Sequence, residues 1–165
     1  MRRAVLVLFA VVAVAGLMQL LRPPPEVVPS PQELKQEGDA FAARREWGRA
    51  AESYRQAFSL EDPVPERAKP RAWLAYLRGV ALARVPIPPD AGRWFDRALR
   101  LDPDLYVVHF ERGLLHDGRH PETTDRRTAR EAFERFLAAS EGAGSPAQDR
   151  GLVEQARAAL ETLAD

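Results

Sequence analysis

One arrangement of small and aromatic residues occurs twice in this chain, and it constrains the fold more than any other feature. The first copy consists of Gly38, Ala50, Tyr54 and Ala57. The second copy consists of Gly79, Ala91, Phe95 and Ala98. In both copies the successive intervals are 12, 4 and 3 residues. Intervals of three and four place residues on one face of an α-helix, so the pattern predicts two similar helical hairpins whose helices approach closely at the small residues.

A third and less regular copy follows the second. Gly113 lies 34 residues after Gly79, and Ala129 and Phe133 keep the interval of four. Four extra residues lengthen the turn between the two helices, and Phe136 stands where the other copies have their last alanine. The sequence therefore predicts three hairpins.

The first hairpin has a well-marked start. Ser30 is suited to an N-cap, Pro31 to the first turn, and Glu33 to the return contact of a capping box. A second helix is expected from about Trp47 to Leu60. A proline-rich insert then separates the first two hairpins, so that their glycines lie 41 residues apart and not 34.

Two segments closely resemble the second helix and closing proline of the tetratricopeptide repeat (TPR), a helix–turn–helix unit of 34 residues. They are AAESYRQAFSLEDP and AGRWFDRALRLDP. The resemblance covers about residues 31–141 and implies an all-α, right-handed solenoid. Its domain would comprise residues 32–144, with repeats at about 32–63, 70–103 and 104–141. In such a stack we expect the aromatic residue of each copy to fill the gap between successive hairpins.

The C-terminal segment, residues 145–165, is expected to form a capping helix. Ser145 and Pro146 resemble another helix start, and an apolar stripe that includes Leu152 and Leu160 follows. A terminal helix of this kind buries the open face of the last hairpin and turns its polar side to water.

Residues 4–21 contain no charged side chain. At 1.5 Å per residue they would form a helix of about 27 Å, close to the roughly 30 Å hydrocarbon core of a bilayer. The preceding Arg2 and Arg3 favour a cytoplasmic N-terminus. We therefore expect residues 1–22 to be an uncleaved, single-pass signal anchor in a bacterial inner membrane, with a periplasmic domain. The alternative is cleavage after Ala15, which would release a secreted soluble protein.

A proline-rich linker connects this segment to the first hairpin. Five of the ten residues in 22–31 are proline. Because proline has no N–H and biases its predecessor towards extended geometry, residues 23–31 should form a semi-rigid spacer.

The composition argues against several functions. Without Arg2, Arg3 and Arg22 the 24 basic residues become 21 against 24 acidic ones, which gives no basis for nucleic-acid binding. The absence of cysteine excludes disulfides and a thiol nucleophile. No phosphate loop, GxGxxG, nucleophile elbow or HExxH occurs. We therefore expect neither catalytic residues nor a cofactor, and no enzymatic activity.

The histidines offer one candidate cluster of metal ligands, formed by His116, Asp117, His120 and Glu122. Since these residues fall in the lengthened turn of the third copy, a solvated polar turn is expected there and no metal site. An enzyme with an unrecognised site around His116 and His120 remains a rival interpretation. His109, in the first helix of the third hairpin, is expected to pack between helices.

The resemblance implies that a partner binds on a concave face lined by the first helix of each hairpin. The candidate binding residues on these helices are Lys35, Asp39, Trp73, Tyr76, Val80, Phe110 and Leu114. Trp73 and Tyr76 are expected to be exposed, because aromatic residues with a polar edge tolerate a half-wet surface. A basic clamp for carboxylates is not expected, since Lys35 has no basic companion in the second repeat. The alternative that many of the apolar members are core residues stays open.

Together these features predict a membrane-tethered scaffold or adaptor that binds a protein or peptide. Proteins that the chain resembles often assist the assembly of envelope complexes, but no residue selects a particular partner. A self-associating structural protein, whose groove pairs with a second copy, is the alternative.

Overall fold

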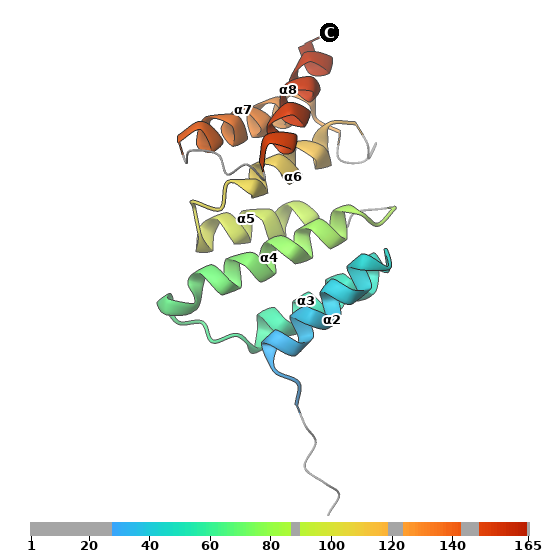
Figure 1. The fold of residues 1–165 in the computed structure, drawn as a ribbon, viewed down its shortest axis with the longest axis vertical. Helices are drawn as coiled ribbons and strands as arrows, with labels where there is room; N and C mark the ends of the chain where they lie inside the picture. Colours follow the sequence, from blue (N-terminus) through green and yellow to red (C-terminus); the bar gives the residue numbers. More distant parts are fainter. Residues whose placement is uncertain (1–27, 87–89, 119–123, 143–148, 165) are drawn as a thin grey trace, which may run out of the picture.

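The computed structural model describes residues 28–86, 90–118, 124–142 and 149–164. Within these ranges the regular structure is entirely helical. The elements are α2 (Pro31–Ala43), α3 (Trp47–Leu60), the 3₁₀-helix η1 (Pro65–Arg67), α4 (Ala68–Ala83), α5 (Ala91–Leu101), α6 (Val107–His116), α7 (Arg126–Gly142) and α8 (Arg150–Ala164). The helices pair as the hairpins α2–α3, α4–α5 and α6–α7, which stack in chain order with α8 at the far end (Figure 1).

The N-terminal segment that was predicted to be an anchor, residues 4–21, lies outside the described ranges, as does most of the linker. Among the helices that the structure does describe, none has the length and apolar character needed to cross a membrane.

The start of the first hairpin confirms the predicted capping box. The hydroxyl of Ser30 accepts a hydrogen bond from the backbone N–H of Glu33 at 3.2 Å, and the carboxylate of Glu33 accepts one from the backbone N–H of Ser30 at 2.7 Å. The bond from the Ser30 backbone, and then that from its hydroxyl, lower the pKa of the Glu33 carboxyl. The second helix has the predicted bounds, Trp47 and Leu60.

In each hairpin an aromatic ring lies directly over a glycine of the facing helix. The pairs are Gly38 with Tyr54, Gly79 with Phe95, and Gly113 with Phe133. In all three, a Cβ atom added to the glycine would lie 2.5 Å from Cε1 of the ring. The rings therefore fill space inside each hairpin, whereas the sequence pattern led us to expect them between successive hairpins. The close helix approach at these glycines is as predicted.

The alanines of the first two copies are also buried. Ala50, Ala57 and Ala98 have no exposed surface, and Ala91 is almost as fully enclosed. In the third copy the corresponding Phe136 is fully buried as well. The larger ring fits because the third hairpin is followed by α8, whose Ala156 and Leu163 belong to the same apolar cluster.

The apolar core of the described residues forms three clusters. One joins α2, α3 and Ala81 of α4, a second extends from α2 to Val108 and Leu115 of α6, and a third joins α6, α7 and α8. The second cluster therefore crosses the joint between the second and third hairpins, where α5 meets α6. Helices α5 and α6 meet over fewer residues than α3 and α4 do. Two ion pairs bridge this joint: Arg84 with the buried Glu111 at 3.0 Å, and Arg112 with Asp96 at 2.8 Å.

Helix α8 is held at both ends. Near its start, the hydroxyl of Tyr106, the N-cap residue of α6, donates a hydrogen bond to Asp149. At its end, the guanidinium of Arg130 on α7 donates to the carbonyl of Leu163 at 2.6 Å, and that of Arg126 donates to Thr162 at 3.2 Å. The helix start that was expected at Ser145 lies outside the described ranges.

Candidate functional site

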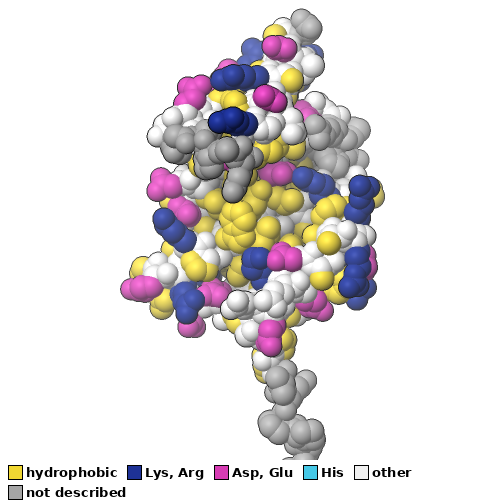
Figure 2. Space-filling view, viewed as in Figure 1, with side chains coloured by type: hydrophobic (Ala, Val, Ile, Leu, Met, Phe, Trp, Pro, Cys, Tyr) yellow, Lys and Arg dark blue, Asp and Glu magenta, His cyan; other side chains and the backbone are white. Residues whose placement is uncertain are grey.

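The residues predicted to bind a partner lie on the first helices of the three hairpins. Lys35 and Asp39 are on α2, Trp73, Tyr76 and Val80 on α4, and Phe110 and Leu114 on α6. In the view of Figure 2, hydrophobic side chains gather over α4 in the middle of the visible face, with basic and acidic side chains around them. These hydrophobic side chains lie over the helix that carries three of the predicted residues, but the predicted residues differ in accessibility.

Two of the predicted aromatic residues are not exposed. Tyr76 is 9% exposed and Phe110 only 3%. Tyr76 lies beneath Trp73, with ring centroids 5.0 Å apart, and its burial, reinforced by Glu111, raises the pKa of its hydroxyl. Phe110 packs against Phe136 with ring centroids 5.3 Å apart. The expectation that Tyr76 is exposed is wrong, because its ring is enclosed in the apolar cluster to which α2 to α6 contribute.

Val80 and Leu114 are half-buried. Val80 packs against the cluster of the first two hairpins, and Leu114 packs against the cluster that α8 completes. Both side chains therefore support the core and offer only part of their surface to a partner.

Trp73 is the accessible aromatic residue of the set, at 40% exposure. It lines a groove of about 600 Å³ between the start of α2, the end of α3 and the start of α4. The groove is lined by Pro31, Gln32, Lys35, Gln36, Glu61, Arg67, Lys69, Pro70, Trp73 and Leu74. Lys35 and Trp73, predicted separately, are thus brought together on one surface.

The groove also contains basic residues that the sequence analysis missed. Arg67 and Lys69, from the insert between the first two hairpins, line it together with Lys35. Lys35 is paired with Asp39 at 2.6 Å, and Arg67 with Glu61 at 3.4 Å. Lys69 makes no ion pair with any residue that the structure describes. The sequence analysis missed these companions because it began the second repeat at residue 70, whereas η1 and the first turn of α4 precede that residue.

Few of the described residues are arranged in a way that could support metal binding or catalysis. No three His, Asp or Glu side chains of the described ranges come together as metal ligands, and His120 and Glu122 lie outside those ranges. His109 lines a small polar pocket of about 170 Å³ between α6 and α7, together with Arg112 and Arg135. Burial, and then the two arginines, lower the pKa of its imidazole. This pocket has no nucleophile paired with a base.

The hairpins and their glycine–aromatic contacts define an all-α, TPR-like stack within the described ranges. No protein-family model matches the chain, and no curated protein matches it. The crystal structure of the Sgt2 TPR domain from Aspergillus fumigatus is similar to it, with 26% sequence identity and a TM-score of 0.49 over 84% of this chain and 85% of that one.

Proposed function

We propose that this chain is a membrane-tethered protein-interaction module that holds a polypeptide segment of its partner in the groove around Trp73. The observation that carries the proposal is the exposed indole of Trp73 in a groove of about 600 Å³ with basic side chains along it. An apolar centre with a polar rim is the usual anatomy of a protein interface. Tryptophan is among the residues that contribute most binding energy.

The packing of the Trp73 ring against Tyr76 favours a role of Trp73 in binding a partner. Its ring rests on the buried Tyr76, so it is held in place before a partner arrives. A side chain that is already ordered loses little conformational entropy on binding, and more of the contact energy is available for affinity.

The position of the groove suggests where the partner is held. Pro31 and Gln32, the first residues of α2, line it. The eight residues 23–30 that precede α2 would span about 25 Å as a polyproline-like linker, at roughly 3.1 Å per residue. With residues 4–21 in a bacterial inner membrane, the partner would therefore be bound close to the periplasmic surface, where envelope complexes assemble.

The groove is tested by comparing the full-length chain with Trp73→Ala and Val28→Ala variants as bait for solubilised membranes. Val28 is an exposed apolar residue outside the groove, so it is a matched control. A partner captured by the wild type and by Val28→Ala, but not by Trp73→Ala, would support the proposal. Circular dichroism establishes that each bait is folded. Equal capture by all three would place the site elsewhere.

The anchor is tested separately. The protein should resist carbonate extraction from membranes, and mass spectrometry of the purified chain should find Met1 or Arg2 at its N-terminus. A mature N-terminus at Gly16 would refute the tethered form and favour a released protein.

A further inference from the structure

A second surface combines three arginines with two aromatic rings. It is formed by Phe58 of α3, Arg71 and Arg78 of α4, and Trp94 and Arg97 of α5. The guanidinium carbon of Arg71 lies 4.7 Å from the centre of the Phe58 ring, and that of Arg78 lies 4.2 Å from Trp94. Arg97 lies between them, 4.4 Å from Phe58 and 5.3 Å from Trp94. We call this set the arginine row.

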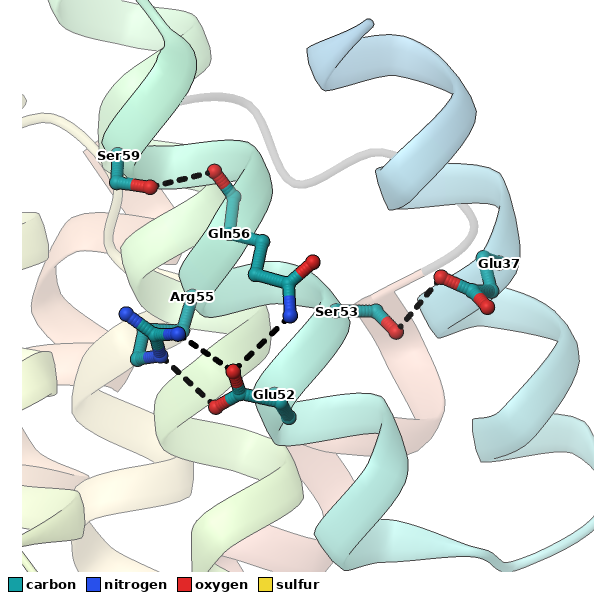
Figure 3. Close-up of polar contacts among 6 residues, drawn as sticks. All are labelled: Glu37, Glu52, Ser53, Arg55, Gln56 and Ser59. Carbon is teal, nitrogen blue, oxygen red and sulfur yellow. Dashed lines mark hydrogen bonds and ion pairs between the residues drawn. The ribbon is translucent and has the colours of Figure 1, made fainter. Parts of the chain in front are cut away.

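The three guanidinium groups of the arginine row make no ion pair and no hydrogen bond with a carboxylate of the described residues. Neighbouring arginines do make such contacts: on α3, Glu52 accepts two hydrogen bonds from Arg55 (Figure 3), and Asp96 of α5 pairs with Arg112 of α6. In Arg71 and Arg78 the Nε atom is buried without an acceptor. Unpaired buried donors of this kind call for an explanation, such as a bound anion.

The positive charges of neighbouring arginines also repel one another. Burial first, and then the neighbouring charges of Arg55 and Arg97, lower the pKa of Arg78. Cation–π contacts compensate for part of the cost, each contributing about 0.5–2 kcal/mol. A cation–π contact, however, supplies no hydrogen-bond acceptor for the N–H donors of a guanidinium. Those donors match the geometry of a carboxylate.

We propose that the arginine row is a docking site for a short acidic peptide segment of a partner protein. Arg71 and Arg78 are seven residues apart on α4, which corresponds to about 10 Å along the helix. An extended peptide covers that distance in about three to four residues. Two or three carboxylates on such a segment would each meet a guanidinium of the row.

The surroundings of the row favour a short acidic peptide over a longer polyanion. Glu52 interacts electrostatically with Arg78, and Asp90 and Asp96 line the adjoining pocket with Arg97. Nucleic acid or an anionic membrane would extend over these carboxylates and be repelled by them. Binding of those polyanions needs a broader basic surface.

The arginine row is separate from the groove around Trp73. Helical residues advance by about 100° each, so Arg71 and Trp73, two residues apart, point to nearly opposite sides of α4. The two surfaces can therefore be occupied independently, and this proposal does not depend on the proposed function of the groove.

The test uses hexaglutamate peptide and the full-length chain in neutral detergent at physiological salt, with affinity measured by isothermal titration calorimetry. The variant Arg71→Gln/Arg97→Gln should bind at least about tenfold more weakly, because each lost charge-assisted contact contributes about 1.5 kcal/mol or more. The control Arg127→Gln/Arg157→Gln removes the same charge from exposed pairs elsewhere and should change affinity by less than about twofold. Trp73→Ala should bind like the wild type.

Two further measurements keep the outcome decisive. Arg97 is exposed, so Arg97→Glu preserves the fold and should by itself weaken binding at least about tenfold. Equal affinity of the wild type and Arg97→Glu would overturn the proposal. It would also be overturned if phosphatidylserine vesicles or a single-stranded oligonucleotide bound the arginine row more tightly than hexaglutamate does.

Discussion

The ring of Phe95 occupies the space that a side chain at Gly79 would need: a Cβ there would lie 2.5 Å from Cε1 and 2.6 Å from Cδ1 of the ring. Phe95 has no exposed surface and cannot move aside into solvent. The distance between α4 and α5 is therefore set by the absence of a side chain at Gly79 and by the size of the Phe95 ring.

Replacing Gly79 with alanine should destabilise the protein by about 1–3 kcal/mol, because the added methyl group overpacks the hairpin. In an unconstrained helix the same change would stabilise by up to about 1 kcal/mol. Gly48→Ala is the matched control, since an added Cβ there meets nothing within 4 Å. Urea denaturation of both variants measures the difference. If both were stabilised, the contact with Phe95 would not govern the spacing.

The joint between the second and third hairpins should depend on Glu111. This carboxylate is 8% exposed and accepts two hydrogen bonds from Arg84. Glu111→Gln removes the charge and should lower the free energy of unfolding by about 1–3 kcal/mol. The control Glu131→Gln removes an exposed partner of Arg127 and should cost less than about 0.5 kcal/mol. Similar losses in the two variants would argue against a special role for this joint.

His109 should make stability depend on pH. Burial and the nearby Arg135 and Arg112 lower the pKa of its imidazole in the folded chain, so the unfolded chain binds the proton more readily. Stability from this group is therefore complete above the ordinary pKa near 6.5 and declines as the pH falls below it. Urea unfolding of the wild type and of His109→Gln at pH 7.5 and 5.5 should show the smaller decline in the variant. An identical decline in both would mean that His109 is not responsible.

The end of α8 should fray when its contacts with α7 are removed. Arg126 and Arg130 donate to carbonyls of the last turn of α8, which have no acceptor role within the helix. The double variant Arg126→Gln/Arg130→Gln should lose hydrogen-exchange protection in residues 150–164, with a cost of about 1–3 kcal/mol. Arg127→Gln, whose side chain pairs with Glu131 on the same helix, is the control and should leave protection unchanged.

The sequence predicted those parts of the fold that depend on one helix or one hairpin. The capping box at Ser30, the bounds of α3 and the close approach at Gly79 all follow from residues within a few helical turns of one another. Accessibility is different, because it depends on the neighbouring hairpin. The burial of Tyr76 could therefore not be derived from its own helix.

The same reason explains the surfaces that sequence reasoning missed. Arg67 lies in η1 and Lys69 at the start of α4, in a stretch that the sequence analysis took as an insert between repeats, so only the folded chain places them over the groove. The arginine row draws on three helices. Two of its arginines recur in the third copy, because Arg112 and Arg135 precede Gly113 and Phe136 as Arg78 and Arg97 precede Gly79 and Ala98. Repeated spacing alone does not show that the arginines of the row converge on the rings of Phe58 and Trp94, which belong to different helices.

The glycine–aromatic contact also bears on how a chain of this kind can lengthen during evolution. Each hairpin contains its own glycine–aromatic contact, so the separation of its two helices does not depend on how many hairpins precede or follow it. A duplicated copy of α4–α5 would bring Gly79 and Phe95 with it and keep its internal geometry. Gene duplication could thus extend the binding surface by one whole unit, while the existing hairpins keep the shapes they already have.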